Sequence, residues 1–184
     1  MNRTTVTAFA FDRACQNLTR FAFAEAARVA KNIGISYEAS DSAPETGKAI
    51  AAEFEAARRE VRAFPVYAGG CERTIYSIPE ANHAFRFWHD FYHWIMGAGV
   101  GLADELRIAE KHAERARAAF GLGSLEAIIQ YVDVSEQARF YSVTGEFVAD
   151  QKAFVFACVT LDIGALALVS QAFATDFMLR HLGA

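Results

Sequence analysis

The sequence contains little proline, glycine or cysteine, and no run of basic residues. Its 184 residues include 3 prolines and 12 glycines, a scarcity that favours long helices over a sheet with many turns. The three cysteines are widely separated and form no C-x-x-C pair, which argues against a disulfide framework or a cysteine zinc site and favours a reducing compartment.

Basic clusters and a leader sequence are also missing. The chain has 18 basic and 22 acidic residues, and no stretch of Lys and Arg forms an electrostatic footprint for nucleic acid. The first residues, MNRTTVTAFAFDRACQ, lack the uninterrupted apolar core of a signal peptide. We therefore expect a cytoplasmic protein that does not bind nucleic acid.

One long apolar run imitates a membrane span. Segment 153–174, AFVFACVTLDIGALALVSQAFA, carries Asp162 near its middle, where a lone carboxylate would cost about 3 kcal/mol in lipid. No basic flank orients the segment strongly. We predict a helix buried in protein and expect no membrane partner; a membrane-spanning helix is the alternative.

Helical periodicity is the strongest pattern in the chain. Apolar residues recur at steps of three and four in six segments. The sequences SAPE from Ser42 and SIPE from Ser77 read as capping boxes that begin the second and third helices. Helix ends are expected at Gly34, Pro65, Gly97, Gly121 and Gly145. We predict one all-α domain over 1–184, a bundle of about six helices, with 65–77 as an irregular loop.

The third expected helix, at about 78–96, contains the segment NHAFRFWHDFYHW. His89 and His93 stand four residues apart and so share one helical face. This spacing lets one helix give two imidazoles to a single metal ion. The helix is apolar nearly all round, which predicts burial, and a metal would offset the cost of burying two histidines. The alternative is that both rings donate to backbone or carboxylate partners in a satisfied core.

The fourth expected helix adds Glu105 and His112 on one side of its apolar stripe. They lie two turns apart, roughly 10 Å along the axis, which is far for one ion. His112 would therefore bind a second metal or hold another ligand in place. Asp90 either pairs with Arg86, one turn away, or orients an imidazole.

Three acids lie in or beside apolar stripes elsewhere: Glu25, Glu136 and Asp162. Each alone is explained by a core ion pair or an interhelical hydrogen bond, and Arg139 is the simple partner for Glu136. Convergence of acids and histidines from separate helices instead favours a metal site between facing helices.

Nitrogen and oxygen donors without thiolate suit Zn, Fe or Mn. We predict a divalent-metal protein with His89, His93, Glu105 and His112 as ligands and Glu136 as a further ligand or general base. Metal-dependent hydrolysis or oxygen chemistry on an unidentified small molecule would follow. The alternative is a non-enzymatic binding or assembly protein with a structural polar cluster, whose 16 phenylalanines and apolar sixth helix serve an interface between identical copies.

The segment FRFWHDFYH, followed by Glu105, His112 and Glu136, resembles a group of phage- and plasmid-encoded proteins. Those proteins carry an FR-x-x-HD segment, a second His, a Glu and a His about seven residues apart, and another Glu. The similarity covers about 82–140, and the two histidines stand one residue closer here. The resemblance implies no activity and points to the same residues. Ferritin-like proteins need two Glu-x-x-His motifs, and HD-type phosphohydrolases need an upstream His; this chain does not meet either requirement.

Overall fold

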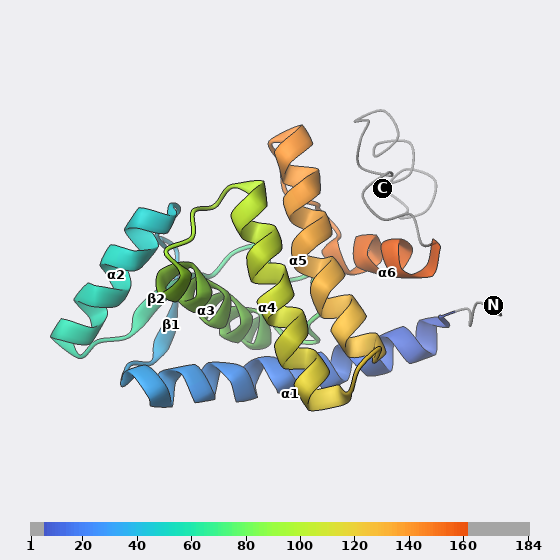
Figure 1. Ribbon diagram of the computed structural model, residues 1–184, viewed down its shortest axis with the longest axis horizontal. Coiled ribbons are helices and arrows are strands. Elements are labelled where there is room, and N and C mark those ends of the chain that lie inside the picture. The colour runs from blue at the N-terminus through green and yellow to red at the C-terminus, as the bar shows by residue number, and fades with distance from the viewer. Residues whose placement is uncertain (1–5, 162–184) are drawn as a thin grey trace.

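A computed structural model describes residues 6–161. In that range six helices and a two-stranded sheet follow one another along the chain (Figure 1). The elements are α1 (Ala8–Ile33), β1 (Tyr37–Ser40), α2 (Gly47–Glu60), β2 (Phe64–Tyr67), α3 (Pro79–Met96), α4 (Leu102–Phe120), α5 (Leu125–Thr144) and α6 (Gln151–Leu161). The predicted helical bundle of about six helices is confirmed.

The helices pack in two main pairs. Helices α4 and α5 lie side by side, and both stand steeply across the long α1, which runs along one edge of the molecule (Figure 1). Helix α3 packs along α1 and contacts α4, with α2 and the small sheet at its far side. This arrangement leaves one face of α3 against α1 and another against α4.

Four of the five predicted helix ends agree with the structure, while the end at Pro65 and the start at Ser42 do not. Gly34, Gly97 and Gly145 follow α1, α3 and α5 in the left-handed conformation, which suits glycine. Ser124 caps α5 by accepting a hydrogen bond from the backbone N–H of Ala127 at 3.3 Å. The prediction that α2 begins at Ser42 was wrong, because α2 begins at Gly47.

The chain is closely packed where α2 begins. A side chain at Gly47 would place its Cβ 2.2 Å from the carbonyl oxygen of Ala98, in the turn after α3. Thr46 precedes this glycine and caps the helix, accepting a hydrogen bond from the N–H of Ala49 at 3.2 Å. The other Ser-x-x-Glu serine, Ser77, does not cap α3; its N–H donates to Thr19 on α1 at 2.9 Å.

The short parallel sheet was not predicted. Helix α2 ends at Glu60, so Phe64 and Pro65 belong to β2 and pair with Tyr37 and Glu38 of β1. Phe64 is fully buried and stacks on the Phe54 ring, with centroids 3.9 Å apart. A helical stripe and a short buried strand are not distinguished by so few apolar residues, which explains the error.

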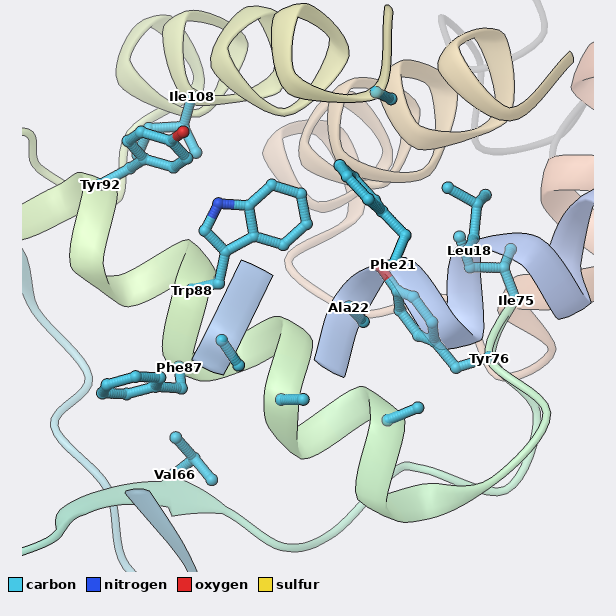
Figure 2. Packing of buried hydrophobic residues seen from close by; sticks show 14 of the residues in the cluster. Leu18, Phe21, Ala22, Val66, Ile75, Tyr76, Phe87, Trp88, Tyr92 and Ile108 are labelled. Carbon is cyan, nitrogen blue, oxygen red and sulfur yellow. The ribbon is translucent and has the colours of Figure 1, made fainter. Parts of the chain in front are cut away.

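The core between α1 and α3 is largely aromatic. Figure 2 shows Trp88 of α3 pointing toward Phe21 of α1, and the two rings meet edge to face with centroids 5.4 Å apart. Trp88 is fully buried on this side of α3, and Phe87 is fully buried on another side, against Tyr37 of the small sheet. Anchored in this way, the helix presents its remaining face to α4.

Only the first part of the long apolar run can be compared with the prediction. Its beginning forms α6, and residues from Asp162 onward lie outside the described range. Within residues 6–161, no helix has the length and apolar character needed to span a bilayer.

Candidate metal site

The two predicted histidines of α3 lie together where this helix meets α4. His93 is buried, and the side chain of His89 is 17% exposed. Their Nε2 atoms are 3.1 Å apart. One helical turn therefore brings two imidazole nitrogens to one point, as their spacing predicted.

Glu105 reaches the same point from the first turn of α4. The chain turns sharply at Gly97, and Asp104 braces the turn by accepting a hydrogen bond from the Gly99 N–H at 2.8 Å. The Glu105 carboxylate then lies across both rings: Oε1 is 3.3 Å from Nε2 of His93, and Oε2 is 3.4 Å from Nε2 of His89. The side chain of Glu105 is 16% exposed, so this end of the cluster borders the solvent.

His112 approaches His89 from the other side. Its Nε2 lies 3.2 Å from Nδ1 of His89, which faces away from Glu105. The ring of His112 is fully buried, against Trp88 at 4.2 Å between centroids and against Phe85 at 5.2 Å. All four predicted metal ligands therefore lie in one cluster, with His89 between His112 and the other two.

Asp90 completes a His-Asp-His group on α3. Each of His89, Asp90 and His93 offers a ligand atom, and these three atoms lie within 4.8 Å of one another. The expected alternative partner of Asp90 is engaged elsewhere, because the Arg86 guanidinium donates to the backbone carbonyls of Tyr67 and Gly69. Glu105 contacts the Nε2 atoms of His93 and His89 at 3.3 and 3.4 Å, so carboxylates from both α3 and α4 border the histidine pair.

Burial and charge act in opposite directions on these groups. Burial disfavours protonation of His89, but the Glu105 carboxylate and its hydrogen bond outweigh burial and raise the pKa of His89. Burial disfavours ionisation of Glu105, yet His89 and His93 together lower its pKa. The pKa of Asp90 rises to about 6, mainly through burial and against the influence of both histidines. Burial and the neighbouring His89 lower the pKa of His112 well below its usual value, so this ring is neutral.

Several nitrogens around the cluster have no hydrogen-bond partner. Within residues 6–161 these are Nδ1 of His93, Nδ1 of His112 and Nε1 of Trp88, and all three are buried. Unpaired buried polar atoms are uncommon in folded proteins and each costs about 1–3 kcal/mol. Trp88 packs on His112 and His93 contacts Glu105, so packing between α3 and α4 leaves these polar groups incompletely paired.

The structure does not bring Glu136 to the histidines. Glu136 is buried, as predicted, but its Oε1 lies 3.4 Å from Nε of Arg139. Its charge acts on Cys158 of α6, where it helps burial to raise the pKa of that thiol to about 12. Among the described residues Arg139 is the ion-pair partner of Glu136, while Oε2 of Glu136 is buried without a hydrogen-bond partner.

Sequence reasoning missed a second buried acid of α5, Asp133, whose charge acts on His89 and also on Tyr76 and Cys15. Asp133 is buried, and burial raises its pKa to about 7, against the influence of Gln137 and His89. It accepts a hydrogen bond from Nε2 of Gln137 at 2.8 Å. Asp133 stands one turn from Ile129, which is fully buried. Helical spacing from that position was the available signal.

Glu25 belongs to a separate cluster. Both of its carboxylate oxygens are bonded to Arg115 of α4, at 2.6 and 3.0 Å, and Oε2 also accepts from Arg28. This is the core ion pair that was the alternative explanation for a buried acid on α1.

No protein-family model matches this chain, and no curated protein or solved structure is measurably similar to it. Its chemistry must therefore be inferred from the site alone. That site combines imidazole and carboxylate donors on two helices, with one end near the solvent and the other enclosed by aromatic rings.

Proposed function

We propose that this protein binds a divalent metal ion between α3 and α4 and uses it in catalysis. The donor separations support the proposal most directly. Ligand atoms about 2.0–2.2 Å from a common ion are roughly 2.8–3.6 Å apart for angles between 90° and tetrahedral. The two Nε2 atoms of His89 and His93 are 3.1 Å apart, and each lies 3.4 or 3.3 Å from its own oxygen of Glu105, so every one of these distances falls within that range.

The donor set also narrows the choice of metal. Two imidazoles and a carboxylate suit Zn, Fe or Mn, and three protein ligands leave a coordination position open for substrate, as in catalytic zinc sites. The side chains of His89 and Glu105 are 17% and 16% exposed, so the cluster is in contact with solvent at these two residues. A bound ion supplies either Lewis-acid activation for hydrolysis or, with a redox metal, oxygen chemistry on a small molecule.

Elemental analysis of protein purified without a histidine tag tests the proposal. After incubation with Zn, Mn or Fe(II) and removal of free metal, we expect one ion per chain for at least one of these metals. The His89→Ala protein should retain none. If no metal remains bound to the unaltered protein in any of the three incubations, the metal proposal is wrong.

The second candidate function is a non-enzymatic binding or assembly protein. The contacts of Glu105 with His89 and His93 are also short enough for hydrogen bonds, so protonated histidines would satisfy this carboxylate without a metal ion. Exposed apolar side chains such as Phe9 (78% exposed) and Phe147 (72% exposed) would then serve contacts with other chains. Light scattering on the metal-free protein distinguishes the two, since this candidate requires a stable assembly and no metal dependence.

A further inference from the structure

His112 occupies an aromatic enclosure. Its ring meets Trp88 at 80° and Tyr92 at 89°, with centroids 4.2 and 5.3 Å apart, and Phe85 closes a third side. Within residues 6–161, its one hydrogen-bonding contact is with His89. Such an enclosure disfavours an imidazolium, so the ring is neutral and carries a single proton.

The geometry between His112 and His89 is that of an in-plane hydrogen bond. The two ring planes differ by 2°, and the ring centroids are 5.3 Å apart. Ring bonds of about 1.3–1.4 Å place each nitrogen roughly 1.1 Å from its ring centre. With the two nitrogens 3.2 Å apart, rings that lie end to end would have centroids about 5.4 Å apart. The centroids are 5.3 Å apart, so the two rings lie nearly end to end. The lone pair of one nitrogen then points at the other, which is the orientation that an N–H···N bond requires.

We propose that His112 is a positioning residue for the metal ligand His89. In the metal-loaded protein, its Nε2 accepts a hydrogen bond from the Nδ1–H of His89, which leaves Nε2 of His89 available to the ion beside Glu105 and His93. This inference rests on the proposed function, since the selected tautomer matters only when an ion binds at Nε2. Metal-binding histidines commonly donate their second ring N–H to such a partner.

This role differs from the predicted role of His112 as a ligand. An ion shared by His89 Nε2 and Glu105 lies on the side of the His89 ring that faces away from His112. Because the rings are coplanar and the enclosure holds His112, its Nε2 is directed at the Nδ1 atom and not at the ion. The same contact fixes the rotation of the His89 ring about its bond to Cβ.

The test compares two substitutions at position 112. The His112→Phe side chain fills the enclosure without an acceptor, while the His112→Gln side chain keeps a hydrogen-bond acceptor. For His112→Phe we expect zinc affinity to fall about 10–100-fold, with a melting temperature of the metal-free protein no lower than that of the unaltered protein. His112→Gln should recover most of the affinity. His83→Phe on α3 is the matched control, because His83 contacts the Ala68 carbonyl away from the cluster and its loss should not change zinc affinity.

Nitrogen-15 NMR of the unaltered protein tests the same inference without any substitution. In the zinc-loaded protein, we expect His89 to be protonated at Nδ1 and metal-bound at Nε2, and His112 to be protonated at Nδ1 only. A metal-bound signal from His112, or wild-type zinc affinity in His112→Phe, overturns the positioning role and leaves the metal proposal intact. If the unaltered protein binds no Zn, Mn or Fe(II), both proposals are wrong.

Discussion

Helix α4 contributes side chains to two polar clusters, whose carboxylates are paired in different ways. Toward α1, Glu25 accepts four hydrogen bonds of 2.6–3.0 Å from Arg28 and Arg115. Toward α3, Glu105 meets two histidines at 3.3 and 3.4 Å, and neighbouring buried nitrogens remain unpaired. The carboxylate is the same chemical group in both clusters, but its partners differ in charge and in number of donors.

The difference shows what a metal ion would add. Guanidinium groups are always charged and bring several donors in a fixed plane, so the Glu25 cluster is closed by the protein alone. Imidazoles carry a proton or a lone pair at each nitrogen, and two facing lone pairs need a cation between them. We therefore expect the Glu25 cluster to determine stability and the histidine cluster to determine metal binding.

The largest expected effect is on metal binding. His89→Ala removes the residue that contacts His93, Glu105 and His112, so zinc affinity should fall at least about 100-fold, beyond the loss typical of supporting residues. Isothermal titration with zinc measures this, and far-ultraviolet circular dichroism should show that helicity is kept. Glu25→Gln should bind zinc as the unaltered protein does; a comparable loss in that variant would mean that the two clusters are not separate.

The second-largest effect is expected on stability, in the Glu25 cluster. Glu25→Gln leaves two arginines beside a buried amide, which should reduce the free energy of unfolding by about 2–4 kcal/mol at pH 7. Urea denaturation measures the loss. The matched control is Glu110→Gln on α4, whose partner Arg117 is at 3.4 Å in an exposed pair, and which should change stability by less than about 0.5 kcal/mol. A similar loss in both variants would contradict the contrast between a buried and an exposed pair.

The stability supplied by Glu25 should also depend on pH. Burial opposes its ionisation, but Arg115 and Arg28 prevail and lower its pKa below 4.5. The contribution is therefore complete above pH 4.5 and is lost as the pH falls through the lowered pKa. In urea denaturation from pH 7 to pH 2, the difference between Glu25→Gln and the unaltered protein should shrink below pH 4.5. A constant difference over this range would refute the linkage.

Asp133 should give the opposite dependence of stability on pH. Its pKa is raised from 3.8 to about 7, so the metal-free protein should lose stability as the pH rises between these values, when the unfolded chain is ionised and the folded chain is not. Asp133→Asn keeps the acceptor for Gln137 and should raise the free energy of unfolding by about 1–3 kcal/mol at pH 8. The gain should vanish near pH 4, and denaturation with a chelator present at both pH values checks this. An equal gain at both values would point to packing as its source.

The smallest effect is expected for Glu136. Its carboxylate contacts Arg139 and lies away from the histidines, so Glu136→Gln should leave zinc affinity within about twofold of the original and stability within about 1 kcal/mol. Zinc titration and urea denaturation measure the two quantities. A tenfold loss of zinc affinity would return Glu136 to the site as the ligand or base that its sequence position suggested.

Much of the site could be predicted from the sequence because it depends on spacing within helices. The separation of His89 and His93 needs only the helical repeat, and Glu105 was placed by its position beside an apolar stripe. The sequence could not show which acid of α5, Glu136 or Asp133, would act on the histidines. Both lie close to buried positions of α5, and their neighbours come from other helices. The Ser42 start was also wrong: Thr46 caps the helix, next to a close approach of Gly47 to Ala98 that joins residues far apart in the chain.

The helices, most of their ends and the face of α3 with two imidazoles could be predicted from the sequence, because they follow from local periodicity and from glycine at helix ends. Which carboxylate contacts which nitrogen depends on the packing of helices that are separate in the chain. The turn after α3 brings Glu105 to the Nε2 atoms, and the aromatic enclosure brings His112 to Nδ1 of His89. These partners depend on how far and at what angle α3 and α4 pack, and local spacing does not set that angle.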